Sequence, residues 1–186
     1  MSIQKRSLCM VVAVFGFGAL SAMADTVDSA RYGRIGCGGT FTSQSQQSTW
    51  DIRNFSDTLP ITIDRMRIYD AMGGVRFDSQ SYGGLPASLN GVLGAGDRSL
   101  EPNQTVTYNT DSLQQQGILV LGIPVPLQLV IDWSATDKVA NLAGSLTRIS
   151  YSISNVLDPN TGTYNQVRGP ELGRAIVVCR NLPVTR

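Results

Sequence analysis

The sequence predicts an all-β protein built as a single antiparallel β-sandwich of about seven to nine short strands. Runs rich in β-branched and aromatic residues recur along the chain, and clusters of Gly, Pro, Asn and Asp separate them. No segment longer than ten residues has a convincing amphipathic helical period. This combination is typical of sandwich folds. An immunoglobulin-like sandwich is favoured and a jelly roll comes second, although the immunoglobulin spacing of cysteine and tryptophan is missing.

Alternation of apolar and polar residues predicts each strand in turn. Trp50 and Ile52 share one parity within residues 48–54, so both are expected in the core. Residues 61–69 change their apolar parity near Asp64, which indicates a bulge there or a strand buried on both faces. The other expected strands lie at residues 75–78, 106–108, 127–133, 145–155, 164–167 and 174–180. In the strand at 127–133, the parity of the leucines also predicts a buried Trp133.

The segments between these strands are expected to be turns, loops and short helices. Residues 79–104 contain five glycines and are predicted to be mainly loop, with 88–93 as the best candidate for a short strand. Residues 112–116 are expected to form a helical turn, and the polar segment 135–144 a short helix. Asp158–Gly162 is a strong turn signal because Asp, Pro, Asn and Gly follow one another closely.

The N-terminus predicts export. Lys5 and Arg6 precede an uncharged apolar run, and Ala22 and Ala24 are the small residues that a signal peptidase recognises. The run of 13 residues, 8–20, is shorter than the roughly 20 residues that a spanning helix needs. We therefore expect a signal peptide at residues 1–24, an N-terminal arm at 25–36, and a sandwich domain at 37–186. The mature protein is expected in the periplasm, at the cell surface or secreted, without a transmembrane segment.

The mature chain would keep two cysteines, Cys37 and Cys179, which lie near its two ends. Two cysteines in an exported chain indicate one disulfide bond. Such a bond would join the first strand to the last. The run Ala175–Cys179 is accordingly predicted to be a buried strand that carries the disulfide.

Composition excludes several classes of function. The precursor has 15 Lys and Arg, 14 Asp and Glu, and no His; without Lys5 and Arg6 the net charge is −1. A near-neutral chain does not indicate a nucleic-acid binder. The missing histidine removes the commonest general base and the commonest metal ligand. We predict no catalytic residues, no metal site and no cofactor.

The stretch Gly117–Pro126 is the first candidate binding site. It overlaps the most hydrophobic stretch of the mature chain, residues 118–130, and its glycines and prolines are typical of a loop. As an exposed patch it could dock a protein partner, a membrane surface or another copy of the chain; the alternative is a strand and corner buried in the core. The residues predicted to contact a partner are Ile118, Leu119, Val120, Leu121, Ile123 and Val125.

Tyr82 is the second candidate, because it is the aromatic residue best placed for exposure. It lies in a glycine-rich loop, whereas Trp50 and Trp133 follow core parities. An exposed aromatic ring can stack on a sugar ring, so a glycan is a possible ligand. The alternative is core packing.

Carboxylate chemistry is the third possibility, since some hydrolases need only two acidic side chains at a defined separation. Nothing in the sequence selects such a pair. The favoured function is therefore a non-catalytic interaction module of the cell envelope or extracellular space that binds a protein partner or its own copies. Carbohydrate binding through loop aromatics and a carboxylate-based hydrolase are the alternatives.

Overall fold

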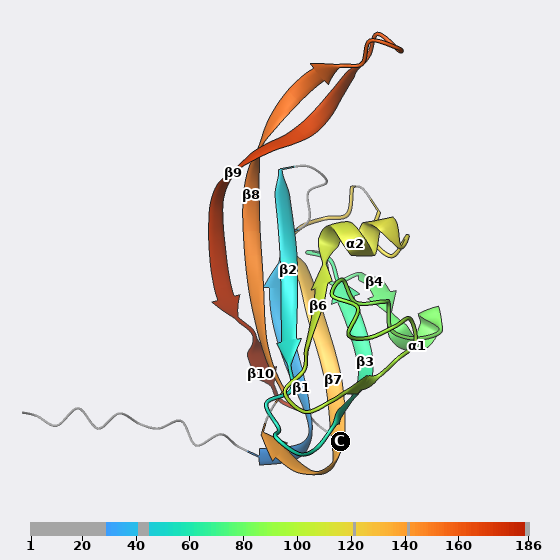
Figure 1. Ribbon diagram of the computed structural model, residues 1–186. Helices are drawn as coiled ribbons and strands as arrows, with labels where there is room; N and C mark the ends of the chain where they lie inside the picture. Colours follow the sequence, from blue (N-terminus) through green and yellow to red (C-terminus); the bar gives the residue numbers. More distant parts are fainter. Residues whose placement is uncertain (1–28, 41–44, 121, 141, 185–186) are drawn as a thin grey trace, which may run out of the picture.

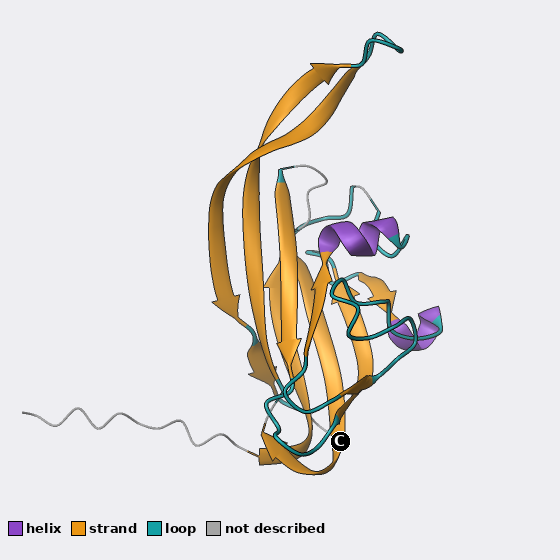
Figure 2. Cartoon of the chain, in the orientation of Figure 1, coloured by secondary structure: helices purple, strands orange, loops and turns teal. Residues whose placement is uncertain are grey.

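The computed structural model describes residues 29–40, 45–120, 122–140 and 142–184. Two antiparallel sheets make up this part of the chain, and two short helices lie to one side of them (Figures 1 and 2). The all-β prediction is confirmed, and the paired sheets are consistent with a β-sandwich. The described strands are β1 (Ser29–Gly39), β2 (Gln46–Arg53), β3 (Ile61–Tyr69), β4 (Val75–Asp78), β5 (Ser99–Leu100), β6 (Thr105–Asn109), β7 (Leu127–Ala140), β8 (Ala143–Leu157), β9 (Tyr164–Val178) and β10 (Arg180–Leu182). The signal peptide predicted at residues 1–24 lies outside the described residues.

The larger sheet has six strands in the order β10-β1-β7-β3-β4, with β5 paired to β3. The smaller sheet has four strands in the order β6-β2-β8-β9. Both sheets direct one face into a shared hydrophobic core, where Trp50 of β2 and Trp133 of β7 are almost fully buried as predicted. The change of parity near Asp64 is a bulge, because the pairing of β3 with β7 shifts register between Ile63 and Arg65.

Both helices are single short turns with polar caps. The helix α1 (Ser79–Tyr82) begins after Asp78, whose side chain accepts a hydrogen bond from the backbone N–H of Gln80. The helix α2 (Thr110–Gln115) matches the helical turn expected at 112–116, and Asn109 caps it in the same way. The helices in the described ranges are too short to cross a bilayer.

Three local predictions are wrong. Residues 135–144 do not form a helix: β7 continues to Ala140, and β8 begins at Ala143. The reason is pairing, because Ser29 and Ala30 of β1 lie opposite Ala140 and Val139 and extend the sheet. Residues 88–93 form turns instead of a strand. The described strands also number ten instead of seven to nine. The strands expected at 164–167 and 174–180 are joined in β9, a single strand of 15 residues that ends at Val178.

The expected N-terminal arm is largely part of the larger sheet. From Ser29 onward its residues belong to β1, which pairs with β7 over most of its length and with β10 at Arg34–Gly36. These backbone groups are therefore already used inside the domain. Residues 25–28 lie outside the described part.

The predicted disulfide is present between Cys37 and Cys179. Cys37 is buried in β1 of the larger sheet, and Cys179 directly follows β9 of the smaller sheet. The bond thus joins the two sheets at the place where the chain leaves one and enters the other. Its sequence separation of 142 residues means that the bond encloses most of the 186-residue sequence.

Candidate interaction surface

The long hairpin of β8 and β9 extends beyond the rest of the molecule (Figure 1). We call its outer part, residues 153–168, the hairpin arm; its pairs run from Ile153 opposite Arg168 to Leu157 opposite Tyr164. The turn at its tip is the one predicted from Asp158–Gly162, and the Asp158 side chain accepts a hydrogen bond from the backbone N–H of Asn160 at 2.8 Å.

The hairpin arm presents apolar side chains to solvent on both of its faces. Val156, Leu157, Tyr164 and Val167 are all exposed. Successive side chains of a strand point to opposite faces, so Leu157 and Tyr164 lie on one face and Val156 and Val167 on the other. Among the described residues, no second sheet covers either face of this part of the hairpin. Exposed apolar groups in such a projection are characteristic of contact surfaces.

The base of the hairpin arm is fixed to the body by a polar cluster. An Arg168 guanidinium nitrogen lies 2.6 Å from a carboxylate oxygen of Asp111 in α2. The same guanidinium lies 4.5 Å from the ring centroid of Tyr151, close enough for a cation–π contact. Gln47 of β2 donates a hydrogen bond to Asp111 at 2.8 Å and accepts one from the Tyr151 hydroxyl at 3.3 Å. Side chains from β2, β8 and α2 therefore fix the position of the hairpin arm where it joins the rest of the domain.

The second exposed region is the C-terminal part of β9, residues 173–178, which we call the edge segment. Ile176 is 68 % exposed and Val178 75 % exposed, both on the outer face opposite Thr147 and Ser145. Val177 lies on the core-facing side opposite the buried Leu146, yet it is still 48 % exposed.

Residues 175–178 are in a strand as predicted, but the prediction that this strand is buried is wrong. The reason is position: among the described strands β9 pairs only with β8 and forms the margin of its sheet (Figure 1). The sequence did carry one signal of this position, because Pro170 lies within β9 and proline in a strand is mostly confined to edges and bulges.

The predicted partner-binding stretch is divided by the fold. Ile118, Leu119 and Ile123 are buried in the core, whereas Val120 and Val125 are exposed. Leu121 lies outside the described residues. The structure thus places half of the predicted patch in the interior and leaves two separated apolar side chains at the surface.

Tyr82 is exposed as expected, at 58 %. Its ring packs edge-on against Phe77, with 5.3 Å between the ring centroids, and so has a supported position. It lines an open hollow of about 240 Å³ together with Gly83, Gly84, Leu85, Pro86, Ala95, Gly96, Gln116 and Ile118.

Two of the surface hollows each have one carboxylate in their lining. Asp64 lines a hollow next to α1, and Asp51 lines another beside Phe55. No group of three potential metal ligands among Cys, Asp and Glu comes together within the described ranges. The hydrolase alternative stays a prediction.

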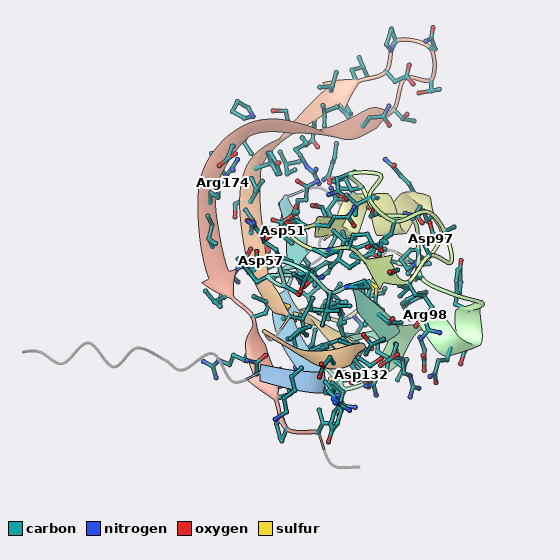
Figure 3. The ribbon with its side chains drawn as sticks, turned by 60° about the horizontal axis from the view of Figure 1, so that its bottom comes forward. Asp51, Asp57, Asp97, Arg98, Asp132 and Arg174 are labelled. Carbon is teal, nitrogen blue, oxygen red and sulfur yellow. A yellow bond between two sulfur atoms is a disulfide. The ribbon has the colours of Figure 1, made fainter. Side chains whose placement is uncertain are left out.

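Several arginines on the outer face of the larger sheet are paired with aspartates. Asp132 of β7 bridges Arg34 of β1 and Arg67 of β3, and Figure 3 labels it on this sheet. Arg65 binds Asp78 through two hydrogen bonds, which lower the pKa of that carboxyl group. Charges on this face are largely neutralised by their neighbours.

These features define a class: a disulfide-linked all-β protein of two antiparallel sheets with a projecting hairpin. Comparison with protein-family profiles, with curated proteins and with solved structures found no match to the chain.

Proposed function

We propose that the mature protein is a non-catalytic interaction module, exported to the periplasm, the cell surface or the extracellular space, that binds a protein partner or its own copies. The observation that carries the proposal is the exposure of apolar side chains along the hairpin arm and the edge segment. Burying this surface against a protein would remove apolar area from water, which is the main driving force of association. The contact surface lies on β8 and β9 instead of the stretch Gly117–Pro126.

Export is supported by two separate features. The N-terminal sequence has the pattern of a secretory signal, and the Cys37–Cys179 disulfide belongs to a class of bond that persists in oxidising compartments. Two antiparallel sheets on one core support a β-sandwich, and within that class we keep the immunoglobulin-like arrangement as the proposal and the jelly roll as the alternative.

Affinity capture from the native envelope tests the proposal. The bait is the disulfide-intact mature chain, and the variant Val156→Lys/Tyr164→Lys replaces two exposed apolar side chains of the arm. We expect the wild type to retain a protein, or more of its own chain, and the arm variant to lose it. Met72→Lys is the matched control, because Met72 is 84 % exposed on a turn of the larger sheet. Equal capture by all three baits would contradict the proposal.

Carbohydrate binding at Tyr82 is the second candidate. It is supported by the exposed ring at the rim of a hollow large enough for part of a sugar. A glycan array should then give a signal that Tyr82→Ala abolishes while its unfolding midpoint stays unchanged. An array without signal for the wild type would remove this candidate.

A further inference from the structure

The last four residues of the edge segment, 175–178, lack the protection that strand edges usually have. Natural edges carry charges, prolines or bulges that prevent another strand from pairing with them. The N-terminal half of β9 has such features, namely Arg168, Pro170 and a register shift that precedes Gly173. From Ala175 to Val178 there is no charged residue and no proline, and the pairing with β8 is regular.

A strand is the kind of partner that fits this edge. Alternate N–H and C=O groups of β9 point away from β8, and only another extended chain offers a matching row of donors and acceptors. Apolar side chains on both faces, Ile176 and Val178 outside and Val177 inside, would pack against side chains of the added strand.

The edge segment is complementary to itself. In a twofold antiparallel pair, directly opposed side chains lie on the same face, so a residue meets itself or a residue an even number of positions away. With the axis at Ile176, Ile176 meets its counterpart, the small Ala175 meets Val177, and Arg174 meets Val178. No like charges face each other, because the two Arg174 side chains lie at opposite ends of the pairing.

Neighbouring axes give shorter or less favourable pairings. An axis at Val177 would place Ala175 opposite Cys179, where β9 has ended and the chain crosses to β10. An axis at Ala175 would extend the pairing to Leu172, where the register with β8 is interrupted. The axis at Ile176 uses the whole regular stretch from Arg174 to Val178.

We propose that two copies of the mature protein associate by antiparallel pairing of their edge segments around a twofold axis at Ile176. The two four-stranded sheets then continue into one sheet of eight strands. This inference rests on the proposed function and names its partner as a second copy. The pairing is about 17 Å long at ~3.4 Å per residue, which is short beside interfaces that bury about 1,600 Å². The dimer is therefore weak and depends on concentration.

Sedimentation velocity on the disulfide-intact mature chain over a wide concentration range is the first test. We expect the average mass to rise from one chain towards two. Ile176→Lys brings two ammonium groups together at the axis and should keep the chain monomeric, whereas Met72→Lys should dimerise as the wild type does. Ile176 is mostly exposed, so its variant should keep the wild-type unfolding midpoint. A monomer at every concentration, or a dimer unaffected by Ile176→Lys, would overturn the proposal.

Cysteine cross-linking tests the register. Directly opposed residues in an antiparallel pair have Cα atoms about 4.5–5.5 Å apart, within the range that a disulfide spans. Ile176→Cys should therefore form a covalent dimer under mild oxidation. Arg174→Cys should not, because the two positions 174 are four residues out of register, about 14 Å at ~3.4 Å per residue. Figure 3 labels Arg174 on β9. Cross-linking at 174 without cross-linking at 176 would overturn this register.

The two proposals fail in different ways. If the chain stays monomeric but still captures another protein through the hairpin arm, the second-copy inference falls and the proposed function stands. If the wild type neither dimerises nor captures any protein, both fall.

Discussion

Strand β3 and the last four residues of β9 have similar apolar character but opposite environments. The run Ile61–Tyr69 and the run Ala175–Val178 are both rich in β-branched residues. Ile61, Ile63 and Ile68 of β3 are almost fully buried, whereas Ile176 and Val178 of β9 are mostly exposed. The difference comes from neighbours, because β3 pairs with β4, β5 and β7, and β9 pairs with β8 alone among the described strands. Whether an apolar strand is buried thus depends on the neighbouring strands and on the layer that packs over it. Its own sequence does not determine its burial.

Truncating one isoleucine in each strand should show the largest contrast. Ile68→Ala leaves a cavity in the core and should lower the free energy of unfolding by about 2–5 kcal/mol. Ile176→Ala removes an exposed group and should change it by less than about 0.5 kcal/mol. Urea unfolding at a concentration where the chain is monomeric measures both. Similar losses for the two variants would mean that the edge segment is covered within one chain.

Removal of the disulfide should lower the free energy of unfolding by a comparable amount. It should also loosen the end of β9 more than the rest of the fold. The double variant Cys37→Ser/Cys179→Ser should lose about 2–5 kcal/mol of stability, because the bond restricts the unfolded chain. In the folded state it also frees the end of β9 from β1. Hydrogen exchange should therefore accelerate more at the amides of Ala175–Val178 than at those of β3. Uniform acceleration across the two strands would contradict a local role for the bond.

The sequence was informative where the pattern depended on one strand alone. The parity change at Asp64 predicted the bulge in β3, and the alternation around Trp50 and Trp133 predicted two core residues. The disulfide followed from counting the cysteines of a chain whose N-terminus predicts export.

The failures have one physical cause, which is contact between distant segments. Alternation tells which side chains share a face of a strand, but it does not tell whether another layer covers that face. The uncharged run Ala175–Val178 was therefore predicted to be buried, and Pro170 was the only sign that β9 lies at an edge. The same holds for the candidate site, since Ile118 and Val120 are close in sequence but only the first is buried.

The ion pair of Arg67 in β3 and that of Arg174 in β9 should differ in how much they contribute to stability, because the first is partly buried and the second is exposed. Asp132→Asn weakens the two ion pairs that Asp132 forms with Arg34 and Arg67, and the Arg67 side chain is mostly buried. The substitution should therefore lower the free energy of unfolding by about 1.5–3 kcal/mol. Glu171→Gln breaks the exposed pair with Arg174 on β9 and should leave stability almost unchanged. Thermal or urea unfolding measures the stability of both variants. An equal loss of stability in the two would contradict the expectation that solvent screens the exposed pair more strongly.

The smallest expected effect is on the pH dependence of stability. Hydrogen bonds from Arg65 lower the pKa of Asp78, and hydrogen bonds from Arg174 lower the pKa of Glu171. A carboxyl group with a lowered pKa stabilises the fold above its unfolded pKa, and this stabilisation disappears as pH falls through the folded value. For Asp78 the decline should start near pH 3.8 and continue below it.

Unfolding curves recorded between neutral and acidic pH check this expectation. The loss of stability in acid should be reduced in Asp78→Asn and barely altered in Glu171→Gln, because solvent screens the exposed pair on β9 more strongly. A larger change in Glu171→Gln would show that the hairpin carries more of the acid sensitivity than the larger sheet.

The Cys37–Cys179 bond has a consequence for proteolysis. The exposed turn at the end of the hairpin, residues 158–163, lies between the two cysteines in sequence. A protease that cuts this turn would produce two fragments that remain covalently linked, and the cut would appear on a gel only after reduction. The molecule can thus be cut at this exposed turn while its two fragments stay covalently joined.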